Sequence, residues 1–177
     1  MRIGKIASVL KAVLSSSNNN RDLVKVFVIL FTIPTEGIAF TTRYVDGRPI
    51  VFWVLSKEVY YALKRVRHRF YSILNKYALK TEVGYIVEEE KINDFMKELR
   101  TWLSQWENVR KLALHFITRP KDFADWPIIE GNIKKLGLTW PPKDLSRHLN
   151  KLRIEVVPIT LPRDKYEELI IKALFEG

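Results

Sequence analysis

Basic and aromatic side chains are interleaved between residues 40 and 71, a combination that can bind an unpaired nucleic-acid strand. Cations can contact phosphates, and aromatic rings offer flat faces on which bases of any sequence stack. The candidate cations are Arg43, Arg48, Lys64, Arg65, Arg67, His68 and Arg69. The candidate aromatic residues are Phe40, Tyr44, Phe52, Trp53, Tyr60, Tyr61 and Tyr71. Together they predict a nucleic-acid-binding surface if the fold brings them close to one another.

A two-residue turn positions the first half of this set. Asp46-Gly47 separates two runs rich in β-branched and aromatic residues, which is a strong signal for a β-hairpin. The pairs expected on one face are Tyr44–Pro49, Thr42–Val51 and Phe40–Trp53, and those on the other are Arg43–Ile50 and Thr41–Phe52. Arg48 should lie beside the turn.

The second half belongs to a predicted helix, residues 56–80. Apolar residues recur along it at helical spacing and define one face to be buried: Val59, Leu63, Val66, Phe70, Ile73 and Tyr77. Ser56 is expected at the N-cap, and the acidic Glu58 in the first turn suits the helix dipole. Most of the basic residues fall on the other side, so the exposed face should be cationic and should carry tyrosines.

Ordinary structural roles compete with this interpretation. Phe40, Phe52 and Trp53 are strand aromatics, and for such residues burial in the core is the simpler explanation. The cluster formed by Arg65, Arg67, His68 and Arg69 is harder to explain as plain surface, because neighbouring cations repel one another unless an anion is near.

The remaining segments predict an α+β fold: a small, mostly antiparallel four-stranded sheet packed with helices, followed by a helical C-terminal extension. Residues 23–33 read as a central strand covered on both faces, and residues 83–87 as a fourth strand. Helices are expected at 88–106, 128–136, 143–151 and 163–175, with an edge strand at 153–162. Residues 109–117 are compatible with either helix or strand, and helix is preferred. The predicted division is an N-terminal amphipathic helix and hinge (1–20), a binding core (21–118) and the extension (119–177).

The positive charge is concentrated in one part of the chain. The net charge is +10. Residues 1–80 hold 14 Lys and Arg against 4 Asp and Glu, whereas residues 81–177 hold 16 of each. All of the excess therefore lies in the first 80 residues, which points to a polyanionic partner, nucleic acid before a membrane surface.

Several chemistries are excluded or disfavoured. The chain has no cysteine, so thiolate metal sites, disulfides and cysteine nucleophiles are impossible. His68, His115 and His148 form no pair with ligand spacing, and no glycine-rich phosphate loop is present. Asp46, Lys57 and Glu58 loosely resemble a nuclease's acid–acid–lysine set, but the turn and the helix start explain them better. No enzymatic activity, cofactor or metal is expected.

The order strand, hairpin, Arg- and Tyr-rich helix, short strand and second helix resembles the single-stranded-DNA-binding ThermoDBP proteins of thermophilic archaea. The resemblance covers roughly residues 23–105 and is carried by EGIAFTTRYVDGRPIVFWVLSKEVYYALKRVRHRFY, residues 36–71. It implies sequence-independent binding of single strands in a cleft lined by aromatics and rimmed by cations. It also implies assembly into a homo-oligomer through a C-terminal helical segment, for which 163–175 is the candidate.

The sequence therefore predicts non-catalytic binding of single-stranded nucleic acid, DNA before RNA, by a basic, aromatic-lined groove. An alternative is an interaction subunit of a larger nucleoprotein assembly that contacts RNA or an acidic protein; a nuclease is a third, less favoured class. A cytoplasmic location without a membrane partner is expected, because the apolar run 23–33 is interrupted by Lys25 and too short to span a bilayer.

Overall fold

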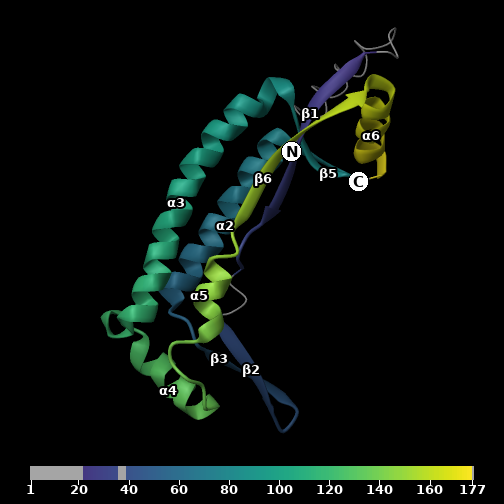
Figure 1. Cartoon of the computed structure of the whole chain (residues 1–177). Helices are drawn as coiled ribbons and strands as arrows, with labels where there is room; N and C mark the ends of the chain where they lie inside the picture. Colours follow the sequence, from purple (N-terminus) through teal and green to yellow (C-terminus); the bar gives the residue numbers. More distant parts are fainter. Residues whose placement is uncertain (1–21, 36–38, 177) are drawn as a thin grey trace. The chain divides into compact units, whose positions relative to one another are not determined.

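The computed structural model describes residues 22–35 and 39–176 and shows an α+β fold (Figure 1). The strands are β1 (Leu23–Thr32), β2 (Phe40–Val45), β3 (Arg48–Trp53), β4 (Ala78–Thr81), β5 (Gly84–Glu88) and β6 (Arg153–Pro162). The α-helices are α2 (Lys57–Tyr77), α3 (Ile92–Thr118), α4 (Trp126–Leu136), α5 (Lys143–Leu149) and α6 (Arg163–Glu176), with 3₁₀ turns at Glu89–Lys91 and Pro120–Asp122. The predicted N-terminal helix lies outside the described residues.

These elements form two compact units that do not follow the predicted linear division. Among the described residues, unit 1 contains 22–31, 73–96 and 154–176, and unit 2 contains 32–35, 39–72 and 97–153. The predicted extension 119–177 is therefore divided between the units. Helices α2 and α3 are long, and each contributes residues to both units.

Unit 1 is built on a four-stranded sheet in the order β4-β5-β1-β6. Strand β5 pairs antiparallel with both β1 and β4. Helix α6 packs on this sheet, and the buried residues shared by sheet and helix are Val26, Val28, Ile86, Tyr166 and Ile170. As predicted, the segment containing Pro158, which has no N–H to donate, forms an edge strand.

The membership of this sheet differs from the prediction. The hairpin β2–β3 forms a sheet of its own, and β4 and β6 complete the four strands instead. Strand β4 was not predicted, because Ala78–Thr81 continues the helical spacing of α2. Helix α2 ends at Tyr77, so the predicted helix end at residue 80 is wrong by three residues. Nor is β1 covered along both faces, since Leu23 and Leu30 are exposed while Val26 and Ile29 are buried.

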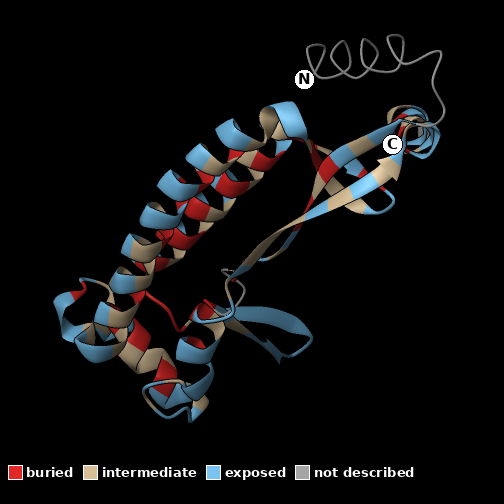
Figure 2. Cartoon of the chain, turned by 45° about the horizontal axis from the view of Figure 1, so that its top comes forward, coloured by how far each residue is buried: buried red, intermediate tan, exposed pale blue. Residues whose placement is uncertain are grey.

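Unit 2 is built on the packing of α2 against α3 (Figure 2). The predicted stripe is buried at Val59, Leu63, Val66 and Phe70, but Leu74 then replaces Ile73 and Tyr77 as the buried residue, because 3.6 residues per turn carry the stripe round the helix. Helix α3 is one continuous helix. It begins at Ile92 rather than residue 88 and includes 109–117 as helix.

The hairpin has the predicted register at all five predicted pairs, from Phe40–Trp53 to Tyr44–Pro49. Asp46 (φ 50°) and Gly47 (φ 74°) both adopt positive φ, which is the conformation required in the two-residue turn that matches strand twist. Both strands are largely exposed, and the hairpin is pale blue over most of its length in Figure 2.

Candidate nucleic-acid interface

Four rings from the hairpin and α2 form a connected series, here called the aromatic run: Phe40, Trp53, Tyr60 and Tyr61. Successive ring centroids lie 5.4, 5.1 and 5.1 Å apart. Each contact is edge-to-face, a favoured arrangement for aromatic pairs that leaves the rings unstacked on one another. Phe40 is 39% and Tyr61 49% exposed, whereas Trp53 and Tyr60 are partly buried. The run therefore offers ring surface to a ligand at both ends.

The local sequence explains this assembly. Phe40 and Trp53 are cross-strand partners, so their side chains share one hairpin face. The connection Val54–Ser56 is short and fully buried, which fixes the first turn of α2 beside the end of β3. Tyr60 and Tyr61 lie in that turn and the next, within reach of Trp53.

The start of α2 is held by Asp125, a residue far away in the sequence. The Ser56 hydroxyl donates to Asp125 Oδ1 (2.9 Å), and the backbone N–H of Lys57 donates to Asp125 Oδ2 (2.8 Å). A carboxylate at this position satisfies a free helix N–H and suits the positive end of the helix dipole. Ser56 lies at the expected N-cap position, where its carbonyl accepts from Tyr60 N–H, but sequence reasoning missed Asp125.

Cations lie over the rings of the aromatic run and of Tyr71. Lys57 Nζ is 5.2 Å from the centre of the Trp53 ring, Lys64 Nζ is 5.9 Å from that of Tyr60, and the Arg67 guanidinium is 5.5 Å from that of Tyr71. Each distance is within the range of a cation–π interaction. Spacings of three and four residues place these side chains on one flank of α2, named here the tyrosine flank: Lys57, Tyr60, Lys64, Arg67 and Tyr71. Its spacing could have added Lys57 to the predicted set.

The structure separates the other predicted residues from this flank. Arg43, Arg48 and Phe52 belong to the hairpin face opposite Tyr44 and Trp53. Tyr44 itself is 74% exposed. On α2, Arg65 and His68 are exposed further round the helix. Arg69 reaches the α3 side, where its Nη1 donates to Gln105 Oε1 (3.3 Å).

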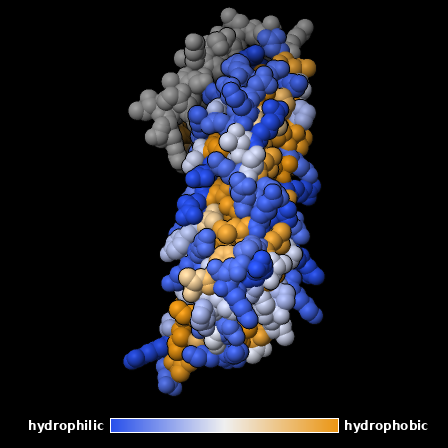
Figure 3. Space-filling model, turned by 90° about the vertical axis from the view of Figure 1, so that its left-hand side faces the viewer, coloured by the Kyte–Doolittle hydropathy of each residue, from blue (hydrophilic) through white to orange (hydrophobic). Residues whose placement is uncertain are grey.

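A cavity of about 510 Å³ lies at the base of the hairpin rather than along the aromatic run. It is lined by residues of the hairpin base, the end of α4 and the start of α5, and it shares only Phe40 with the run. Of the fourteen candidate cations and aromatics, only Phe40 lines this cavity. On the face that Figure 3 presents, hydrophilic and hydrophobic side chains are interspersed.

Cations in different parts of the chain differ in whether a carboxylate pairs with them. Arg43, Arg48, Lys64 and Arg65 form no ion pair with another described residue. By contrast, Arg110, Lys134 and Lys165 each lie within 4 Å of a nearby carboxylate. The charges of Arg43, Arg48, Lys64 and Arg65 are therefore free to meet an external anion, whereas much of the later charge is balanced locally.

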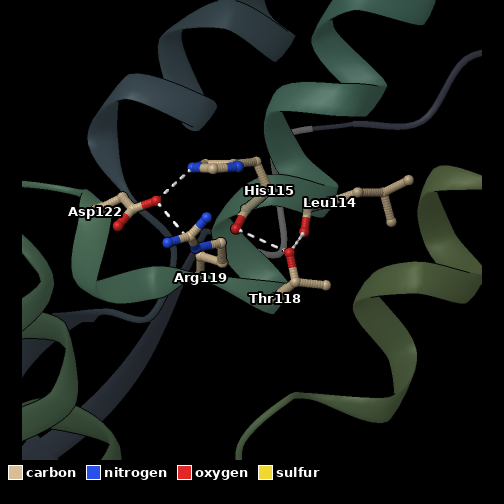
Figure 4. Close-up of polar contacts among 5 residues, drawn as sticks. All are labelled: Leu114, His115, Thr118, Arg119 and Asp122. Carbon is tan, nitrogen blue, oxygen red and sulfur yellow. Dashed lines mark hydrogen bonds and ion pairs between the residues drawn. The ribbon is translucent and has the colours of Figure 1, made fainter.

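A histidine–aspartate pair at the end of α3 was not predicted (Figure 4). His115 Nε2 lies 2.9 Å from Asp122 Oδ2, which is also 3.5 Å from Arg119 Nε. The hydroxyl of Thr118 donates to the backbone carbonyls of Leu114 and His115 rather than to the imidazole. The Thr118 hydroxyl is therefore bound to the backbone, and the His115–Asp122 contact lies at the end of the helix, where side chains can stabilise the last turn.

The described residues contain neither a candidate metal site nor a helix that could span a membrane. Among the described residues, no three His, Cys, Asp or Glu side chains gather so that they could hold a metal ion. Over the same part of the chain, every helix is too short or too polar to cross a membrane.

Unit 1 contains a polar groove of about 190 Å³ with an unusual tyrosine. Tyr166 is 4% exposed, and its hydroxyl donates to Glu88 Oε1 (3.2 Å). Burial raises the pKa of Tyr166 well above its usual range, and repulsion and hydrogen bonding by the Glu88 carboxylate raise it further.

This shift predicts sensitivity to alkaline pH. The folded chain retains the phenol proton that the unfolded chain releases near pH 10, so the stabilisation is complete below pH 10 and is lost as the pH rises above it. The loss should approach about 1.4 kcal/mol per pH unit. Urea unfolding at pH 8 and pH 11 should show a smaller decrease for Tyr166→Phe than for the unaltered protein; an equal decrease would contradict the assignment.

Comparison of the chain with family models, curated proteins and solved structures gave no match. The resemblance to ThermoDBP proteins consequently stays a prediction.

Proposed function

We propose that this protein binds single-stranded nucleic acid, DNA before RNA, without catalysis, through the aromatic run, Tyr44 and the tyrosine flank. The support is physical: rings with exposed surface lie beside cations on the same side of the hairpin and α2. Bases would stack on the rings, and phosphates would contact the lysines and arginines. Because every base has a flat face, such binding would be largely independent of sequence.

One observation carries most of the proposal. The excess positive charge of the chain lies in its first 80 residues, and Arg43, Arg48, Lys64 and Arg65 have no carboxylate partner among the described residues. In addition, Lys57 and Lys64 lie over the Trp53 and Tyr60 rings, an arrangement that solubility alone would not require. A phosphate backbone would neutralise these cations and release counterions.

The test is fluorescence anisotropy with labelled single-stranded DNA, single-stranded RNA and duplex DNA of equal length. If about 6–10 phosphates are contacted, affinity for the single strands should fall by roughly 300-fold to 10⁴-fold between 50 and 200 mM salt. Affinity that stays flat over this range, or stronger binding to duplex, would contradict the proposal. The RNA sample shows whether a 2′-hydroxyl is tolerated.

A pair of lysine variants locates the binding surface. Lys57→Gln combined with Lys64→Gln should lower the slope of log affinity against log salt by about 0.7 for each lost phosphate contact. The matched control is Lys134→Gln with Lys165→Gln, because these lysines are paired with Glu130 and Glu168. Equal slopes for the two double variants would place the phosphates elsewhere.

The other functional classes are outcomes of the same measurements. Magnesium-dependent shortening of the labelled strand would indicate a nuclease. Absence of binding to all three nucleic acids, together with co-purification of an acidic protein, would favour the interaction subunit.

A further inference from the structure

The two edges of the hairpin can be distinguished by their hydrogen bonding. Val54 N–H donates to the carbonyl of Ala39 (2.9 Å), so Ala39 and Val54 form a hydrogen-bonded pair. Antiparallel pairs alternate, so Phe40–Trp53, Thr42–Val51 and Tyr44–Pro49 are non-hydrogen-bonded pairs. The backbone groups of these six residues therefore point away from the partner strand, at the outer edges.

The outer edge of β3 is protected at both ends. Pro49 has no N–H to offer to another strand, which is a common way to block an edge. At the other end, the outward carbonyl of Trp53 accepts a hydrogen bond from Asn132 Nδ2 of α4 (2.9 Å). Only the middle of this edge is open.

The outer edge of β2 has no comparable protection. Phe40, Thr42 and Tyr44 all have an N–H, and within the described part of the chain no strand pairs with this edge. The hairpin also exposes apolar side chains on both faces, among them Val45 (50%), Ile50 (40%) and Val51 (50%). A two-stranded sheet with two exposed faces is only marginally stable by itself, so additional strands would stabilise it.

We propose that the edge of β2 pairs antiparallel with the same edge of a second copy of this chain, giving a four-stranded sheet across a two-fold axis. Such an interface is isologous: each copy contributes the same edge, and the pairing leaves neither edge open. A second copy is favoured over a foreign strand because β2 can pair with an antiparallel copy of itself without placing Arg43 opposite Arg43.

Charge selects the register of this pairing. With the axis at Thr42, Phe40 lies opposite Tyr44 of the second copy, and Arg43 lies opposite Thr41. A shift that places Arg43 opposite itself puts two like charges in direct contact, which is destabilising. The Thr42 register also pairs all three outward-facing residues of β2, and it places the aromatic residues Phe40 and Tyr44 opposite each other.

This inference does not depend on the proposed function. It uses backbone groups at a sheet edge, whereas the proposed binding uses ring faces and cations. The test therefore contains no nucleic acid, and either proposal can fail while the other holds.

The decisive variant is Thr42→Pro, which removes an outward N–H without breaking a bond inside the hairpin. Its matched control is Val51→Pro, at the directly opposite position on the other edge. Light scattering after size exclusion should show a dimer, or a larger even oligomer, for the unaltered protein and for Val51→Pro. Thr42→Pro should have half that mass with an unchanged circular dichroism spectrum.

A second measurement covers the case in which proline disturbs the hairpin. The chain has no cysteine, so Thr42→Cys introduces a single thiol at the axis. The two Cα atoms would be about 5.5 Å apart, within the range that a disulfide spans. Thr42→Cys should oxidise to a covalent dimer at least tenfold faster than Val51→Cys. A monomeric unaltered protein, an undiminished mass for folded Thr42→Pro, or equal oxidation rates would each overturn the proposal.

Discussion

Alanine at both Tyr44 and Tyr61 should weaken binding of single-stranded DNA by about 1–3 kcal/mol for each ring, or roughly 30-fold to 10⁴-fold together. Both rings are well exposed, Tyr44 at 74% and Tyr61 at 49%, so their main loss should be stacking surface rather than core packing. Anisotropy titrations at constant salt would measure the change. Because no charge is removed, the slope of affinity against salt should stay the same.

Phe175→Ala is the matched control for this result. Phe175 is an aromatic residue with 77% exposure, but it lies on α6 and is not part of the candidate surface. It should leave the affinity unaltered. Equal effects of Phe175→Ala and the double tyrosine variant would show that binding does not use the surface described for the hairpin and α2.

Trp102→Ala should lower the free energy of unfolding by about 3–5 kcal/mol, a large part of a typical total of 5–15 kcal/mol. Trp102 is 1% exposed, and its ring centre lies 5.1 Å from that of Phe70. Its indole N–H also donates to the backbone carbonyl of Val66 (2.7 Å), so truncation leaves a buried acceptor without this donor as well as a cavity. Chemical denaturation followed by circular dichroism would measure the loss.

Leu103→Ala tests whether this effect is specific to the buried side of α3. Leu103 is the next residue but is 41% exposed, so its replacement should change the stability by only about 0.5 kcal/mol. Trp102→Phe should fall between the two, because it keeps much of the ring but loses the hydrogen bond. Similar losses for Trp102→Ala and Leu103→Ala would mean that the α2–α3 packing is not as described.

The sequence was most informative where structure depends on near neighbours. The hairpin register follows from a two-residue turn and strict alternation of side chains, so every predicted pair is confirmed. The buried stripe of α2 follows from helical spacing in the same way. Both patterns are contained in short segments and require no knowledge of distant residues.

Pairings between distant segments could not be predicted in this way. Whether the hairpin joins the sheet of β1 depends on contacts with β5 and β6, and β6 lies more than 100 residues further along the chain. Likewise, ALKT at residues 78–81 suits a helix as well as a strand. It is a strand because β5 is available to pair with it.

The candidate site was predicted by residue type but not by arrangement. Closeness in the sequence grouped Arg65, Arg67, His68 and Arg69 as one cluster. In the structure, Arg67 lies over the Tyr71 ring and Arg69 reaches Gln105. Only the packing of α2 against its neighbours decides which side is open. The connected rings of Phe40, Trp53, Tyr60 and Tyr61 depend in turn on the buried connection between β3 and α2.

The contact between Asp125 and the start of α2 affects how this protein can be dissected. A fragment ending at residue 118 would contain all fourteen candidate binding residues. It would lack the Asp125 carboxylate, which accepts hydrogen bonds from the Ser56 hydroxyl and the Lys57 backbone N–H. It would also lack Asn132, which holds the end of β3. Loss of binding by such a fragment would then report a disordered junction rather than missing contacts to the ligand. Point variants in the full chain are therefore the sound way to map the surface.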